Sequence, residues 1–119
     1  MNDYAERPHF SRALDNWREN FSDDSPEVAI INHLLSHCQG WHNAIPLTKL
    51  GAKFGVTGHW IQHKLILPSR KQGGPFIGTC HAGAFVLRTL VDVNKLLDFY
   101  QNRIAAEQCH CNRLIELSR

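Results

Sequence analysis

The segment at residues 47–65, LTKLGAKFGVTGHWIQHKL, constrains the fold more than any other part of the chain. Apolar residues recur at helical spacing on both sides of Gly55, which can adopt the positive φ of a tight turn. Thr57 follows two residues later and is a favourable N-cap for a second helix. The segment therefore predicts two short helices joined by a turn of a few residues, with Pro46 opening the first helix.

Two further helices are predicted before this segment. Over residues 9–21 the apolar side chains recur at helical spacing, at Phe10, Leu14, Trp17 and Phe21. Ser25 is a favourable N-cap and Pro26 suits the first helical position, and Gly40 is expected to end the helix that they begin. Residues 41–45 are expected to form a short strand before the central pair of helices.

The second half of the chain predicts a hairpin and a long helix. Pro68 is expected to stop or kink the second central helix, and a basic connector, SRKQGG, follows. In PFIGTCHAGAFVL, residues 75–87, apolar runs flank a small-residue tip, which predicts a β-hairpin with Phe76 and Ile77 in its first strand. Near-heptad apolar spacing over residues 92–117 predicts a long amphipathic helix.

Together these elements predict a mainly α-helical fold with a small β-hairpin. A chain of 119 residues is long enough for one core. We divide it into an N-terminal acidic arm or helix at 1–25, a central domain at 26–91 and a C-terminal amphipathic helix at 92–119. No stretch approaches the roughly 18 apolar residues of a membrane span, and the N-terminus lacks the features of a signal peptide, so we expect a cytoplasmic protein with reduced cysteines.

Charge is distributed unevenly along the chain. Residues 1–27 carry seven acids and three bases, and residues 92–119 carry four of each. Residues 28–91 contain no Asp or Glu, but six Lys and Arg residues and six of the eight histidines. This block predicts a surface that meets a polyanion. It also argues against an enzyme, because no carboxylate is available there for acid-base catalysis or for orienting a histidine.

Three helices followed by a two-stranded hairpin is the element order of a winged helix-turn-helix domain. LTKLGAKFGVTGHWIQHKL and GGPFIGTCHAGAFVL resemble the turn and wing segments of small winged-helix proteins of phage and prophage origin, and VDVNKLLDFYQNRIAAEQ looks like the helix that such proteins place after the wing. The resemblance covers residues 26–107. It implies a double-stranded DNA-binding regulator of transcription or replication on a mobile element. Pro68 departs from the pattern, because such proteins usually continue the recognition helix at that point.

Candidate DNA contacts follow from this fold. Residues predicted to meet the major groove lie at the start and on the solvent face of the second central helix: Thr57, Gly58, His59, Gln62, His63 and Lys64. Residues predicted to contact phosphates or the minor groove lie on the first central helix, on the connector and near the wing tip: Lys49, Lys53, Arg70, Lys71, Thr79 and His81. Glutamine can pair with adenine in a bidentate manner, and His or Lys can donate to guanine or to phosphate.

A metal site is the main alternative use of the histidines. His59 and His63 are one helical turn apart, but the position after His59 is Trp60, whereas a catalytic HExxH helix has glutamate there. A structural zinc site would have to combine residues of the wing and the last helix: Cys80, His81, Cys109, His110 and Cys111. A Cys-x-Cys pair alone is a weak signal, so we expect no metal and no cofactor.

The last helix predicts a second contact surface. Its apolar stripe is longer than a single small domain needs, which favours a homodimer. The dimer contacts predicted on this basis are Leu96, Leu97, Tyr100, Ile104, Cys111 and Leu114. The alternative is that the stripe packs within the chain against the helix at 9–21.

Two other functions remain open on the sequence. A phage-encoded inhibitor or adaptor, for example an anti-CRISPR protein, would dock its winged helix on a host nucleic-acid-handling complex. A basic winged helix can also grip duplex RNA by shape. Inhibition by DNA mimicry is disfavoured, because mimicry needs an acidic surface and residues 28–91 have none.

Overall fold

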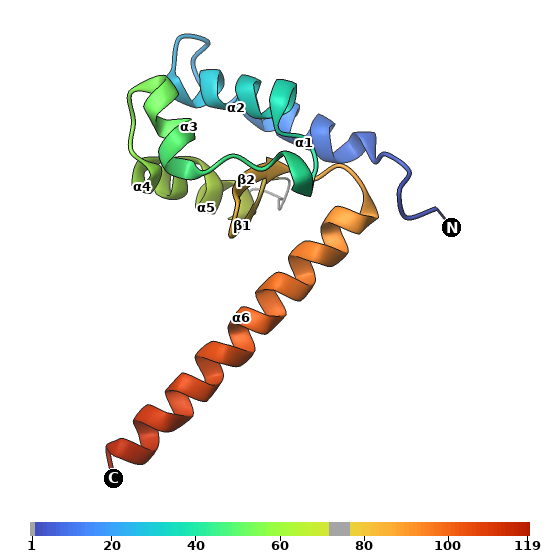
Figure 1. Cartoon of the computed structure of the whole chain (residues 1–119). Coiled ribbons are helices and arrows are strands. Elements are labelled where there is room, and N and C mark those ends of the chain that lie inside the picture. Colours follow the sequence, from blue (N-terminus) through green and yellow to red (C-terminus); the bar gives the residue numbers. More distant parts are fainter. Residues whose placement is uncertain (1, 72–76) are drawn as a thin grey trace.

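The computed structural model describes residues 2–71 and 77–119. The helices are α1 (Pro8–Arg18), α2 (Pro26–His37), α3 (Leu47–Phe54), α4 (Gly58–Ile61), α5 (Leu67–Lys71) and α6 (Leu90–Leu117), with a short 3₁₀ turn, η1 (Trp41–Asn43), and one turn of π-helix, η2 (Gln62–Ile66) (Figure 1). Two antiparallel strands, β1 (Ile77–Cys80) and β2 (Gly83–Val86), form the hairpin. The predicted mainly helical fold with a small hairpin is confirmed.

The helix boundaries follow from local sequence. The Ser25 hydroxyl accepts a hydrogen bond from the backbone N–H of Val28 at 3.3 Å, and Pro26 opens α2. Gly55 ends α3 with a φ of 71°, and the Thr57 hydroxyl caps the next helix by accepting from the N–H of Trp60 at 3.0 Å. These predicted helix signals are confirmed.

Two glycines let α3 and α4 approach each other closely. A Cβ atom on Gly51 would lie 2.3 Å from the carbonyl oxygen of Val56, and one on Gly58 would lie 3.2 Å from the Cβ of Leu47. The first distance is shorter than van der Waals contact allows. The turn between the two helices therefore requires glycine at position 51, and its backbone lies directly on α3.

Pro68 does not stop the second central helix. The helical path runs from Gly58 through η2 into α5 and reaches Lys71. In a regular α-helix the proline ring would meet the carbonyl group four residues earlier. Here the N–H of Leu67 bonds to the carbonyl of Gln62, five residues back, and this wider turn accommodates the proline. The start of the predicted connector, Ser69 to Lys71, is therefore helical, and its remainder lies outside the described residues.

The predicted strand at 41–45 is wrong. Residues 41–43 form η1, and only Ile45 pairs with the hairpin, through N–H···O bonds of 2.9 and 2.8 Å exchanged with Ala84. Pro46 follows directly and has no N–H with which to extend the pairing. The hairpin itself pairs Ile77 with Val86. The predicted strand residue Phe76 lies outside the described residues.

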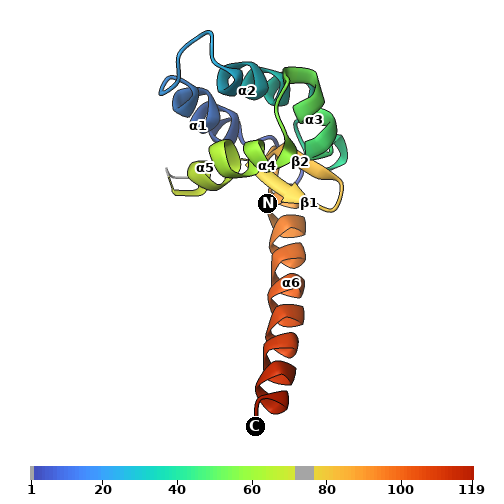
Figure 2. The ribbon, with the colours of Figure 1, turned by 90° about the vertical axis from the view of Figure 1, so that its left-hand side faces the viewer.

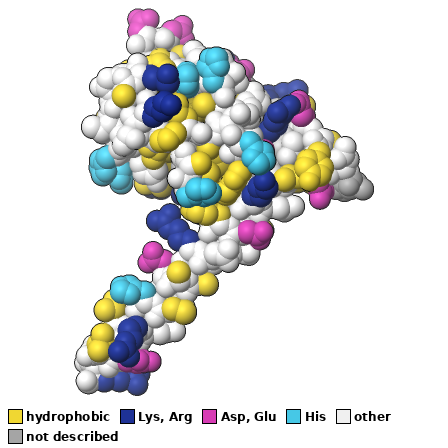
Figure 3. Space-filling view, viewed as in Figure 1, with side chains coloured by type: hydrophobic (Ala, Val, Ile, Leu, Met, Phe, Trp, Pro, Cys, Tyr) yellow, Lys and Arg dark blue, Asp and Glu magenta, His cyan; other side chains and the backbone are white. Residues whose placement is uncertain are grey.

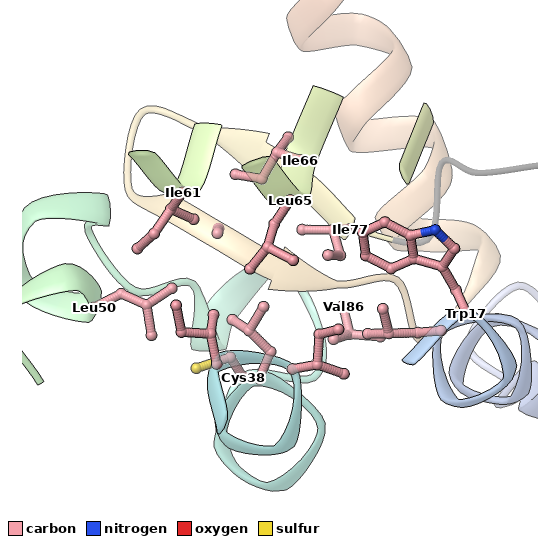
Figure 4. Packing of buried hydrophobic residues seen from close by; sticks show 13 residues of the cluster. Trp17, Cys38, Leu50, Ile61, Leu65, Ile66, Ile77 and Val86 are labelled. Carbon is pink, nitrogen blue, oxygen red and sulfur yellow. The ribbon is translucent and has the colours of Figure 1, made fainter. Parts of the chain in front are cut away.

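The main core lies between the helices and one face of the hairpin (Figure 4). Side chains of α1 to α4, of η2 and of the turn after α2 meet those of the strands there: Leu14, Trp17, Ile30, Ile31, Leu34, Cys38, Leu50, Ile61, Leu65, Ile66, Ile77, Ala84 and Val86. Because Leu14 is fully buried and Trp17 is 7% exposed, α1 is part of the central domain, whereas residues 1–25 were predicted to be a separate arm or helix.

The other face of the hairpin is covered by α6. Phe85, Leu87 and Leu96 form a second buried cluster there, against which Phe10 also packs. A Cβ atom on Gly78 would lie 2.9 Å from Leu96, so the helix sits directly on the strand. Beyond this contact α6 extends away from the rest of the molecule (Figures 1 and 2). No helix in the described part of the chain has the length and apolar character needed to span a membrane.

Candidate nucleic-acid interface

The helical segment from Gly58 to Lys71 presents a polar outer face. Its inner side chains, Ile61, Leu65 and Ile66, are fully buried, which fixes the orientation of the segment on the core. Residues predicted to contact DNA that are exposed on the segment or at its N-cap are Thr57, His59, His63, Lys64 and Lys71. Two others, Gly58 and Gln62, are half-buried. The burial of the inner side chains thus leaves a row of hydroxyl, imidazole and ammonium groups in solvent.

The two histidines of this face lie against each other, with their ring planes tilted by 42°. The ring centroids of His59 and His63 are 4.1 Å apart, as expected for residues one helical turn apart. Within residues 2–71 and 77–119 no three His, Cys, Asp or Glu side chains gather in a way that would hold a metal ion. His81, at the hairpin tip, lies near Phe99 on α6, and Cys109 is ten residues further along that helix, about 15 Å away at the rise of an α-helix.

Exposed lysines extend the basic surface onto α3. Lys49 and Lys53 are both exposed, and Figure 3 shows Lys, Arg and His side chains together over α2 and α3. Burial lowers the pKa of His33 on α2, and the neighbouring charges of His37 and Lys53 lower it further. His33 is therefore harder to protonate than a free histidine, chiefly because it is partly buried and secondarily because positive charges lie nearby.

Arg70 and Thr79, predicted as phosphate contacts, are engaged within the fold. The Arg70 guanidinium donates from Nη2 to the Tyr100 hydroxyl at 2.7 Å and to the Thr79 hydroxyl at 3.1 Å, and the two hydroxyls are 3.0 Å apart. The guanidinium also lies over the Tyr100 ring, 5.4 Å from its centroid. This network ties α5, β1 and α6 together at one point. The sequence gives no signal for it, because its members are up to 30 residues apart.

Arg88 is also engaged, by an acid from the N-terminal segment. Its Nε donates to a carboxylate oxygen of Glu6 at 2.8 Å, and the pair forms a salt bridge. Of the six Lys and Arg residues in the acid-free block, the exposed ones without such a partner in the described structure are Lys49, Lys53, Lys64 and Lys71. These four lysines and the neighbouring histidines carry the basic surface.

A groove separates the Gly58–Lys71 segment from α6. Its volume is about 630 Å³. It is lined by Gln62, Leu67 and Arg70 on one side and by Tyr100, Arg103, Ile104, Glu107, Gln108 and Cys111 on the other. Gln62 therefore faces α6 as well as solvent. Arg103 is a further positive charge beside the candidate interface that was not among the predicted contacts.

The predicted dimer contacts on α6 fall into two groups. Leu96 is 3% exposed and packs against the hairpin of its own chain, so its assignment to a dimer surface is wrong. Tyr100 is half-buried in the network with Arg70. The remaining predicted contacts are exposed on the extended part of the helix: Leu97, Ile104, Cys111 and Leu114.

Comparison of the chain with protein-family models, with curated proteins and with solved structures gave no match in any of the three.

Proposed function

We propose that this chain is a winged helix-turn-helix protein that binds double-stranded DNA and catalyses no reaction. The element order supports this: α2, α3 and the Gly58–Lys71 segment are followed by a hairpin. Ile45 pairs with Ala84 where a winged-helix sheet would take a third strand, here reduced to one residue. The Gly51 contact with Val56 supports a helix-turn-helix, because it holds the second helix close against the first.

The observation that carries the proposal is the outer face of the Gly58–Lys71 segment. An α-helix fits the major groove of DNA when its exposed side chains can reach base edges and phosphates. Here His59, His63 and Lys64 are exposed on a helix whose opposite side is anchored in the core. These groups donate hydrogen bonds to guanine or to phosphate, and no carboxylate in residues 28–91 opposes the approach of a polyanion.

The other basic residues have different parts in this proposal. Lys49, Lys53 and Lys71 are exposed and would hold phosphates that flank the major groove of the DNA. Arg70 and Thr79 would act indirectly: the hydrogen bond from Arg70 to Thr79 would fix the angle between the recognition helix and the wing, and the Tyr100 hydroxyl would hold both side chains in place. His81 is exposed at the wing tip and would contact the backbone or the minor groove.

The resemblance to phage and prophage proteins is the basis for the biological role that we infer. We infer that the chain regulates transcription or replication on a mobile element. A protein that docks on a host nucleic-acid-handling complex is the competing function, and it needs no affinity for free DNA.

Fluorescence anisotropy separates these functions. The full chain is titrated into labelled duplex DNA, single-stranded DNA and duplex RNA across a salt series. The proposal predicts that duplex DNA binds most tightly and that affinity falls steeply with salt, because binding releases counterions from the phosphates. Tighter binding of duplex RNA would indicate recognition of duplex shape instead. An absence of binding at low salt would contradict DNA binding and favour the protein-docking function.

A further inference from the structure

The outer part of α6 exposes apolar side chains that nothing in the described structure covers. Every residue from Gln101 to Arg119 is exposed. The large apolar side chains among them include Ile104 at 66%, Leu114 at 51%, Ile115 at 50% and Leu117 at 66% exposure. Figure 3 shows apolar side chains in the open along this extension, between charges of both signs.

This extension has few interactions of its own to hold it helical. In the described structure its side chains make three interactions, all on the surface: the Arg113–Glu116 salt bridge, a hydrogen bond between Gln108 and Asn112, and one from the Ser118 hydroxyl to the carbonyl of Ile115. Such pairs contribute only about 0.2–0.5 kcal/mol each. Most helical stability in proteins comes from packing an apolar face, so the extension needs a surface against which to pack.

The spacing of the apolar residues fits another helix. Leu97, Tyr100 and Ile104 are separated by three and four residues, and Cys111 and Leu114 continue the same repeat. Alternating separations of three and four residues are the spacing of apolar residues along the seam of a coiled coil. The seam is interrupted once, where Glu107 stands at the position that would face the partner helix.

The groove at the base of the extension offers room for the end of such a helix. It holds about 630 Å³, and its lining includes Leu67 from α5 and Ile104 from α6. A second helix that runs along α6 would reach this groove with its terminal turns. The last turns of α6 itself carry Leu114 and Leu117, which are of suitable size and apolar character.

We propose that two copies of this chain pair through α6 in antiparallel orientation, so that the last turns of each helix fill the groove between α5 and α6 of the other. The inference is independent of DNA binding.

Glu107 favours this orientation over a parallel one. In a parallel pair the two Glu107 carboxylates would face each other within the seam, and like charges at close range are unfavourable. In an antiparallel pair Ile104 lies opposite Leu114 of the second copy, and Glu107 lies opposite Cys111. Residues 101–119 carry three Arg and two Glu residues, so two copies of the extension do not repel each other strongly. The two domain bodies then lie at opposite ends of a helical pair about 30 Å long.

Sedimentation equilibrium tests whether the pair forms. The full chain is expected to be a dimer at micromolar concentration. Ile104→Glu places a charge in the seam and is expected to give a monomer with less helix by circular dichroism. Asn102→Glu adds the same charge on the opposite face of α6 and is the matched control, expected to remain dimeric. A monomeric wild-type chain, or an Ile104→Glu variant that is still dimeric, would overturn the proposal.

Cross-linking tests the orientation. Two variants are oxidised under mild conditions in a background in which Cys109 and Cys111 are both replaced by Ser. Ile104→Cys together with Leu114→Cys is expected to form covalent dimers, because positions 104 and 114 meet across an antiparallel pair and lie too far apart to bridge within one helix. Ile104→Cys alone is expected to form none. Covalent dimers of the single variant would show that the helices are parallel and overturn the proposed orientation.

Discussion

The Arg70 guanidinium donates a hydrogen bond of 2.7 Å to the hydroxyl of Tyr100, thirty residues later in the chain. The same nitrogen donates to Thr79 on the first strand of the hairpin. Three elements that the sequence presents separately, the end of the second central helix, the hairpin and the last helix, are thus joined through one side chain. We expect this contact to set the angle between the Gly58–Lys71 segment and the hairpin as well as to stabilise the fold.

Tyr100→Phe tests the stabilising part of this role. Loss of the hydroxyl leaves the half-buried Arg70 with Thr79 as its acceptor, and bonds to charged groups contribute more than neutral ones. The free energy of unfolding, measured with urea, should fall by about 1–2 kcal/mol. Tyr4→Phe, which changes a tyrosine that is 76% exposed, should have no measurable effect. Equal stability of the Tyr100→Phe variant and the wild type would show that the bond contributes nothing.

Asp92 is predicted to be the most sensitive acid in the chain. It is 6% exposed, and its carboxylate accepts hydrogen bonds from the backbone N–H groups of Trp41, Arg88 and Thr89 at 2.9, 2.9 and 3.2 Å. Asp92→Ala should lower the free energy of unfolding by about 2–3 kcal/mol, because it leaves these donors without a partner. Asp98→Ala, at an exposed position of the same helix, should change it by less than about 0.5 kcal/mol. Similar losses for the two variants would contradict the capping role.

Thiol reactivity should distinguish Cys109 from Cys38. Burial raises the pKa of the Cys38 thiol, and its side chain is 3% exposed. Cys109 is exposed and points away from the seam proposed above. Peptide mapping after a short treatment with iodoacetamide should therefore find Cys109 alkylated and Cys38 intact, with Cys38 reacting only after unfolding. Rapid alkylation of Cys38 in the folded protein would contradict the packing of the core.

His33 predicts a dependence of stability on pH. Burial, His37 and Lys53 lower its pKa in the folded state below the usual value of 6.5. The folded state then binds the proton less readily than the unfolded state, so this histidine lowers stability as pH falls through 6.5 towards the lowered pKa. Urea midpoints should decrease over this range, and the decrease should be smaller in His33→Gln. His110→Gln, at an exposed position on α6, should leave the pH dependence unchanged.

Local signals in the sequence were sufficient for the start of α2, the end of α3 and the start of α4. Ser25, Pro26, Gly55 and Thr57 act through hydrogen bonds and dihedral angles within a few residues, so their effects can be read without the fold. The long last helix was predicted for the same reason, since apolar periodicity is a local property.

Contacts between distant residues could not be predicted in this way. Whether Pro68 ends a helix depends on the hydrogen-bond register before it, and the π turn at Gln62–Ile66 has no recognised sequence pattern. Leu96 and Ile104 have similar apolar character in the sequence, but only Leu96 reaches the hairpin. Arg70 was predicted to be available for phosphate contact, because its hydrogen-bond acceptors, Thr79 and Tyr100, lie on two other elements.

The salt dependence of binding measures whether lysines on the outer face of the Gly58–Lys71 segment hold DNA phosphates, as we propose. Anisotropy titrations of duplex DNA are compared for the wild type, Lys64→Ala and Arg12→Ala. The last variant removes the same charge from an exposed position on α1, a helix that contributes no residue to the proposed interface. If four lysines per chain hold phosphates, the slope of log affinity against log salt should be about −3 to −4 for each chain bound. Lys64→Ala should bring this slope about one unit closer to zero, and Arg12→Ala should leave it unchanged. An absence of binding, or equal effects of the two substitutions, would show that this face of the protein does not bind DNA.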